Sequence, residues 1–373
     1  IWGDRYSRKL ADVLTVEQEL TSTIVRKLRL EITGEESERL AQRGTDDPVA
    51  YQLFLKGVHF MEGTADEMLK GRAALEEAVE LDPDYAEAHA ALANTHMLAL
   101  LHGTENSEEA LRATRASMDR ALAADPDLAG TYIVAGNIKL LYDWDLPGAE
   151  AAFARAIELA PSMSVAHQEY AWCMWAKGDS EQALISSQRA LDLDPLSRGP
   201  MHHIGYTQMA ARQFDDAIAS FRRVLEVYPE WIWGHVKLGV AYAHNGMPGE
   251  ALAHAAEAES LIARGGETPL LRGWLGVLYA RSGEEGKARD AIAQLQGEQD
   301  FNSEVAIEIA ALYLALGEPE TSLDWLERGY AARAPWFVFV PEYFFFDDLR
   351  GELRFEKLME EFKSHTASLS GTM

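Results

Sequence analysis

Residues 196–229 read LSRGPMHHIGYTQMAARQFDDAIASFRRVLEVYP, and this stretch of 34 residues is one unit of a repeating pattern. It ends on a proline, and Pro195 and Pro161 precede that proline at the same interval. Equal spacing of like residues is how a stacked repeat shows itself in sequence. Gly205 and Ala217 place a small residue in each half of the stretch, which allows two helices to pack closely. The pattern therefore predicts helix–turn–helix units.

The pattern continues on both sides and predicts about eight units between residues 49 and 333. The second unit is longer than the others because its inter-helix loop is extended around His102–Asn106. The sixth unit lacks the closing proline, and the second helix of the eighth, Thr321–Arg333, diverges from the pattern. Loss of the pattern toward an end is expected, because terminal repeats must cap the core. The predicted fold is all-α, a right-handed superhelix whose core grows in one dimension.

The charge balance constrains the partners. The chain has 34 basic and 60 acidic residues, a formal net charge of −26. Nucleic acid and anionic membranes require a positive protein surface, so neither is expected as a partner. The charge favours a basic or neutral partner, or serves solubility alone.

The single cysteine indicates the redox environment in which the protein is found. Cys173 excludes an internal disulfide and fits a reducing environment. It lies in the apolar stretch Tyr170–Trp175 and is expected to be a core residue. No apolar run approaches the roughly 18 residues of a membrane span, and no signal peptide opens the chain. We expect a cytoplasmic location. Residue 1 is Ile and not Met, which suggests a fragment or a processed product.

The flanks of the repeat array form two further segments. Residues 1–48 are expected to be a linker from an upstream domain, with a helix that starts after the capping box at Thr15. Residues 334–373 combine an aromatic segment with a capping helix. The aromatic segment is expected to plug the last helix pair; the alternative is a surface patch for a partner or a dimer.

The repeat resembles the tetratricopeptide repeat over residues 49–333. The flanks narrow the resemblance: Trp2–Leu14 looks like the exit of the TolB-like (FlgO-type) domain that precedes such repeats in bacterial signalling proteins. Leu30–Glu36, Tyr142–Asp145 and Phe345–Arg350 belong to the same resemblance. In those proteins the upstream module is a nucleotide cyclase, a serine/threonine kinase or a winged-helix regulator. The resemblance implies a sensory or scaffolding arm, and the Pro341–Phe344 stretch departs from the more polar relatives.

The same resemblance implies a peptide-binding groove, because in that family the first helix of each unit lines the concave face. The groove positions are rich in Trp, Tyr and Met, which make adaptable contacts of high energy at interfaces. The alternative is that these side chains pack against neighbouring helices. The implied groove residues are Asn94, Asn137, Gln168, Trp172, Trp175, His202, Tyr206, Met209 and Trp233.

Residues suited to catalysis are few. The chain has no Gly-rich phosphate loop, no paired-cysteine motif and no His-Glu-x-x-His motif. His202 and His203 are adjacent, which on a helix points them about 100° apart and disfavours a shared metal. His202 alone, without an orienting carboxylate or a nucleophile, is a weak acid–base candidate. We expect no catalytic residue, no metal and no cofactor, and therefore no enzyme in this chain.

The function predicted from sequence is a protein- or peptide-binding scaffold, the regulatory or sensory arm of a bacterial signalling protein. The first alternative is a scaffold for homo-oligomerisation, such as a homo-dimer, through the aromatic tail or an outer face. The second is an enzyme in its own right, which the missing motifs disfavour.

Overall fold

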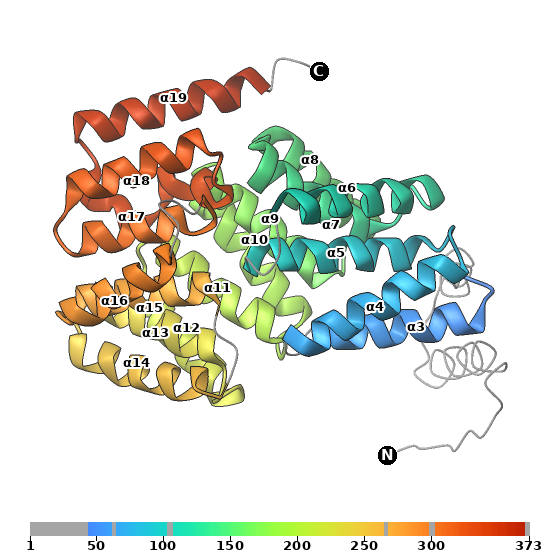
Figure 1. Ribbon diagram of the computed structural model, residues 1–373, viewed down its shortest axis with the longest axis horizontal. Helices are drawn as coiled ribbons and strands as arrows, with labels where there is room; N and C mark the ends of the chain where they lie inside the picture. The colour runs from blue at the N-terminus through green and yellow to red at the C-terminus, as the bar shows by residue number, and fades with distance from the viewer. Residues whose placement is uncertain (1–43, 62–64, 103–106, 265–267, 298–302, 370–373) are drawn as a thin grey trace. The chain divides into compact units, whose positions relative to one another are not determined.

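All regular structure in the described part of the chain is helical. The computed structural model describes residues 44–61, 65–102, 107–264, 268–297 and 303–369 (Figure 1). No strand occurs within these ranges. The prediction of an all-α fold of helix–turn–helix repeats is confirmed. The linker helix predicted near Thr15 lies outside the described residues.

The helices follow one another as eight pairs in the described chain. The first helices are α3 (Pro48–Phe60), α5 (Ala86–His102), α7 (Ala129–Ile138), α9 (Ser164–Ala176), α11 (Arg198–Ala210), α13 (Ile232–His244), α15 (Pro269–Arg281) and α17 (Ala306–Ala315). The second helices are α4 (Ala65–Leu81), α6 (Ser107–Ala124), α8 (Leu146–Leu159), α10 (Ser180–Leu193), α12 (Phe214–Val227), α14 (Pro248–Ile262), α16 (Glu285–Gln296) and α18 (Pro319–Ala331). Shorter elements are the π-helical turn η2 (Lys139–Asp143) and the 3-10 helices η3 (Ser303–Val305), η4 (Pro335–Glu342) and η5 (Phe344–Leu349), and α19 (Leu353–Leu369) comes after them.

The turns inside the pairs follow from local chemistry. After α9, Gly178 adopts φ 81°, a left-handed conformation that ends a helix readily only at glycine. The Asp179 side chain then accepts a hydrogen bond from the backbone N of Gln182 at 3.0 Å and caps α10. Arg212 adopts φ 60° in the corresponding turn of the next pair. A non-glycine residue there is strained, so its side chain is expected to have a role that offsets the strain.

Small residues of the repeat pattern allow the helices of a pair to approach closely. A Cβ atom on Gly276 of α15 would lie 2.9 Å from the Cβ atom of Ala291 on α16 and 2.7 Å from Leu312 on α17. Contacts that short do not occur between real side chains, so a larger residue would push both neighbouring helices away. The sequence pattern is therefore a packing requirement.

The chain divides into two compact units. The first comprises Ile1–Leu98 and Ala110–Gly130, and the second comprises Ala99–Glu109 and Thr131–Met373. In the first unit, Tyr51 of α3 and Tyr85 are buried together with small residues of α4 and α5. Phe54 packs beside Tyr85, with ring centroids 5.2 Å apart.

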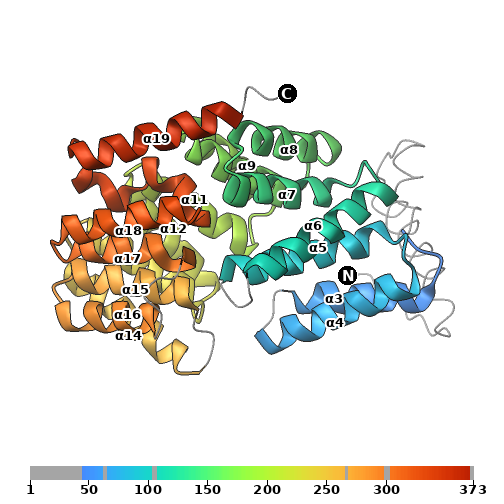
Figure 2. The ribbon, with the colours of Figure 1, turned by 45° about the horizontal axis from the view of Figure 1, so that its top comes forward.

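In the second unit, the first helices of successive pairs contact one another in order. Helix α9 contacts α11, α11 contacts α13, α13 contacts α15, and α15 contacts α17. Figure 2 shows the later pairs, from α14 to α18, lying side by side. We call the surface to which α9, α11, α13, α15 and α17 contribute the inner face.

The aromatic segment after α18 is buried within this second unit. η4 contacts α17 and α18, as expected of a plug over the last pair, but it also contacts η2 and α9 at the other end of the unit. Phe337, Phe339, Phe344, Phe345 and Phe346 are each 2% exposed or less. The segment therefore extends along the inner face beyond the last pair, and its five phenylalanine rings are not available as a surface patch.

Candidate functional site

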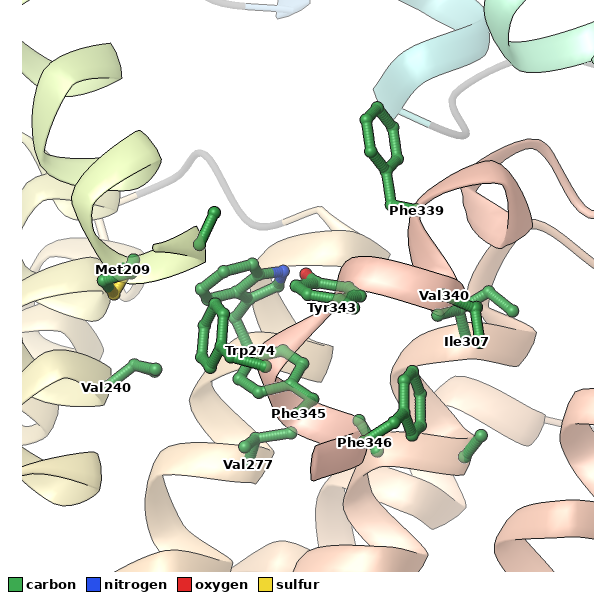
Figure 3. Close-up of a cluster of buried hydrophobic side chains, with 14 of the residues drawn as sticks. Met209, Val240, Trp274, Val277, Ile307, Phe339, Val340, Tyr343, Phe345 and Phe346 are labelled. Carbon is green, nitrogen blue, oxygen red and sulfur yellow. The ribbon is translucent and has the colours of Figure 1, made fainter. Parts of the chain in front are cut away.

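Residues 335–349, which we call the C-terminal segment, pack along the inner face through their aromatic rings. Phe339 stacks on Trp175 of α9, with ring centroids 4.5 Å apart. Tyr343 lies beside Trp274 of α15 with its hydroxyl 3.4 Å from that of Tyr206, and Phe345 packs against Trp274 at 4.9 Å (Figure 3). The C-terminal segment thus lies where the sequence predicted that a peptide would bind.

Ion pairs hold the same segment in place. Arg212 donates to both carboxylate oxygens of Asp347, at 3.0 Å and 2.6 Å, and to the carbonyl oxygen of Glu342 at 3.0 Å. Burial opposes ionisation of Asp347, but hydrogen bonds from Arg212 and Arg350 outweigh it and lower the pKa of this carboxyl. Bidentate arginine–carboxylate ion pairs are among the stronger polar contacts. This contact accounts for Arg212 at a position where other pairs have glycine.

Four of the predicted groove residues belong to the same hydrophobic cluster as the C-terminal segment. Trp175, Tyr206 and Met209 are 3%, 4% and 0% exposed, respectively. Trp172 is partly buried and packs edge-on against Phe339 at 5.2 Å. Figure 3 shows Met209 on the left of the cluster, with Trp274 between it and Val340 of the segment. Trp175 and Met209 are therefore core residues in this structure.

Asn137 and Gln168 meet at a polar cluster instead. Both side chains hydrogen-bond the carboxylate of Glu169, which sequence reasoning did not single out. Burial raises the pKa of Glu169 to about 7, and the two amides only partly oppose this effect. Asn94 is partly exposed on α5 in the first unit and does not belong to this group.

His202 and Trp233 line a cavity of about 170 Å³ on the inner face. Its walls are almost entirely aromatic or aliphatic. Trp172, Trp231, Trp233 and Trp336 are partly exposed, whereas Trp274 is buried. The complete lining is Trp172, His202, Tyr206, Trp231, Trp233, Lys237, Leu270, Trp274, Glu308, Trp336 and Tyr343. We call this cavity the tryptophan pocket.

A buried lysine belongs to the tryptophan pocket. Lys237 of α13 is 4% exposed, and its Nζ atom lies over the ring of Trp274 and 4.3 Å from the ring centroid of Tyr206. Burial lowers the pKa of Lys237 well below its usual value, and the nearby Glu308 only partly opposes this. Cation–π contacts with the rings favour the charged form, but they do not replace a carboxylate partner.

Two further polar groups of the pocket are buried. Glu308 of α17 is 2% exposed, and burial raises its pKa to about 7. Burial is also the main reason that the pKa of His202 lies well below its usual value, with Lys237 adding to the effect. The His202 ring packs perpendicular to Trp231 at 4.9 Å. At neutral pH, His202 is therefore uncharged.

Sequence reasoning missed most of the pocket lining. Lys237 and Glu308 each interrupt an apolar run, Val236–Val240 and Ala306–Ala310, and a lone charge in such a run could have signalled a buried polar site. The other missed members are Leu270 and the aromatic residues Trp231, Trp274, Trp336 and Tyr343.

The pocket is suited to binding an apolar group beside a polar one. Large apolar cavities with a few convergent polar groups are the usual form of ligand sites. In the described residues, no three His, Cys, Asp or Glu side chains are placed to hold a metal ion. Among the same residues, no helix is long and apolar enough to cross a membrane.

Comparison with known proteins supports the repeat assignment. Residues 204–263 match the family model of the tetratricopeptide repeat. A protein from Rhizobium meliloti (strain 1021) named putative adenylate cyclase 3 is 38% identical over 94 residues. The match covers 25% of this chain and 16% of the cyclase.

Solved structures of similar fold are distant in sequence. The APC/C hetero-tetramer Cut9-Hcn1 aligns with 96% of this chain and 60% of its own, at 16% identity and a TM-score of 0.54. A tetratricopeptide repeat protein from Parabacteroides merdae ATCC 43184 aligns with 74% of this chain and 100% of its own, at 14% identity and a TM-score of 0.46. The first of these supports the fold alone.

Proposed function

We propose that this chain, whose residues 204–263 match the tetratricopeptide repeat, is a protein-binding scaffold that serves as the regulatory arm of a bacterial signalling protein. The resemblance of its flanks to such proteins supports the signalling role, as does the local similarity to a putative adenylate cyclase. In this proposal the chain binds and does not itself catalyse. Its charge of −26 favours a basic or neutral partner.

The observation that carries the proposal is the group of partly exposed tryptophans at the tryptophan pocket. Trp172, Trp231, Trp233 and Trp336 all contribute to its lining and all keep part of their surface accessible. Tryptophan is enriched among the residues that dominate the energy of protein interfaces. The deeper groove positions are filled by the C-terminal segment, so a partner is expected to contact these four residues and not Trp175.

The alternative of homo-oligomerisation through the aromatic tail loses its main support. The phenylalanine rings on which it relied are buried inside the second unit. An oligomer would have to use another surface, such as an outer face of the repeats or the partly exposed tryptophans of the pocket.

Photo-crosslinking tests the proposed partner surface. A benzophenone amino acid is placed at Trp233 in the full-length protein in its own cells, and at Ile185, which is 55% exposed on α10, as the control. We expect a discrete protein adduct from position 233 that is absent from position 185 and weakened by Trp336→Ala. No adduct at position 233, or the same adducts at both positions, would contradict the proposal.

The proposed signalling role has a separate test. The gene region before residue 1 is expected to encode a TolB-like domain, preceded by a cyclase, kinase or winged-helix module. A metabolic enzyme or a secreted domain there would contradict the signalling role and leave the scaffold role standing.

A further inference from the structure

Two buried polar atoms of the tryptophan pocket lack a hydrogen-bond partner among the described residues, and a buried lysine without an ion pair lines the same pocket. Glu308 Oε2 and His202 Nε2 are buried atoms with no hydrogen-bond partner among the described residues. Aromatic rings surround the Nζ atom of Lys237. Among the described residues, no carboxylate lies within ion-pair distance of it. Buried polar groups are normally paired, because an unpaired one loses its hydration without compensation.

Unpaired polar groups that converge on an apolar cavity indicate a site that a ligand completes. The cavity volume of about 170 Å³ is close to that of the ~150 Å³ apolar cavity known to accept benzene. One ring-sized apolar group therefore fits, with a small polar substituent beside Lys237.

We propose that the tryptophan pocket binds a small organic acid that has a ring-sized apolar body, with its carboxylate beside the Nζ atom of Lys237. The aromatic walls receive the body of the ligand, and the ligand carboxylate supplies the counter-charge that the ammonium group of Lys237 lacks in the folded chain. A cationic ligand is disfavoured, because Lys237 already occupies the faces of Trp274 and Tyr206.

Glu308 and His202 complete the binding of the carboxylate. Because its pKa is raised to about 7, Glu308 is largely protonated below neutral pH and can donate a hydrogen bond to a ligand oxygen. Neutral His202 can donate through Nε2 in the matching tautomer. This inference goes beyond the proposed scaffold role and does not require a protein partner.

Titration calorimetry of the full chain with phenylacetate tests the inference. At pH 6 we expect a Kd of roughly 1 mM or tighter, within the range that so few heavy atoms can supply. Phenylacetamide, which has the same shape without the charge, is expected to bind at least roughly tenfold more weakly. Benzylamine is expected not to bind. A tetrapeptide that ends in phenylalanine is expected to bind more weakly than phenylacetate.

Two variants assign the effect to the pocket. Lys237→Met keeps the length of the side chain and is expected to weaken phenylacetate binding at least roughly tenfold. Lys287→Met removes a lysine that lies over the Tyr279 ring outside the pocket, and it is expected to leave binding unchanged. Circular dichroism checks that both variants fold.

The pH dependence gives a readout that does not rely on Lys237→Met being stable. The titratable groups facing Lys237 are His202, Tyr206, Glu308 and Tyr343. Above pH 7, Glu308 ionises and repels the ligand carboxylate, so the affinity for phenylacetate is expected to fall. Glu308→Gln retains a donor but does not titrate, and it is expected to reduce this fall; the part that remains reflects loss of the proton of Lys237, whose pKa is also lowered by burial.

Several results would overturn the inference. The inference fails if phenylacetate gives no heat of binding, or if benzylamine binds as tightly as phenylacetate or more tightly. It also fails if Lys237→Met binds phenylacetate as the parent protein does, or if the peptide binds more tightly than phenylacetate. A failure of this kind leaves the photo-crosslinking test of a protein partner unaffected.

Discussion

Trp175 and Trp233 show that neighbouring positions of one repeat pattern have different roles. Trp175 is 3% exposed and stacks on Phe339, whereas Trp233 is partly exposed at the tryptophan pocket. The sequence placed both in the groove, because the repeat register determines which face of a helix a residue occupies. It could not determine what covers that face.

Alanine substitutions separate the two roles. Trp175→Ala is expected to lower the free energy of unfolding by about 3–5 kcal/mol, because it removes a buried ring that the surroundings cannot replace. Trp233→Ala is expected to cost about 1 kcal/mol of stability and to weaken binding at the pocket. Chemical denaturation measures both. Equal losses of stability would show that Trp233 also belongs to the core.

His244 provides a prediction on pH. Its ring packs against Phe214, Phe344 and Phe345, and burial lowers its pKa to about 3. Above pH 6.5 the ring is neutral in both states. Below that pH the unfolded chain binds a proton that the folded chain does not, so stability falls as the pH drops from about 6.5 toward 3.

His244→Phe removes this dependence. When the pH falls from 7.5 to 5, the parent protein is expected to lose about 1–2 kcal/mol more free energy of unfolding than the variant. The smaller end of that range allows for the part of the ring that solvent reaches. Urea denaturation at the two pH values measures the difference. If both proteins lose the same free energy of unfolding between pH 7.5 and pH 5, His244 accepts a proton as readily in the folded state as in the unfolded state.

At the scale of elements, the C-terminal segment acts on the whole inner face of the second unit. Its contacts reach α9 and η2 as well as α17 and α18. Arg212 and Asp347, which anchor it, are 135 residues apart, and the hydroxyls of Tyr206 and Tyr343 are 137 residues apart.

Truncation after Arg333 tests this role. The shortened chain is expected to lose hydrogen-exchange protection in α9 and α11 as well as in α17 and α18, because all of them pack against the segment or depend on it. A chain that ends at Leu369 is the control and is expected to keep full protection. Loss of protection confined to α17 and α18 would show that the segment only caps the last pair.

The helix pairs could be predicted from sequence because their signals are local. The prolines at 161, 195 and 229 and small residues such as Gly276 act within one pair or between adjacent pairs, so a repeating pattern records them. Which side chains cover the inner face depends on contacts between segments that are distant in sequence. No repeating pattern in the sequence reports such contacts. Lys237 and Glu308 come from different pairs, and their proximity is apparent only in the folded unit.

At the scale of the whole molecule, the repeats and the C-terminal segment have different roles. The first helices of the second unit form an inner face, the C-terminal segment packs against it, and the tryptophan pocket is an accessible part of it. The proposed partner and the proposed organic acid both depend on this arrangement. Both proposals therefore require that the C-terminal segment occupies the inner face.

Hydroxyl-radical footprinting of the native full chain, with the urea-unfolded chain as reference, tests this claim most directly. We expect Trp175, Phe339 and Tyr343 to be oxidised far more slowly in the native chain than in the unfolded one, while Trp233 and Trp336 remain reactive in both. Rapid oxidation of Phe339 and Tyr343 in the native chain would show that the segment does not occupy the inner face, and would contradict the claim.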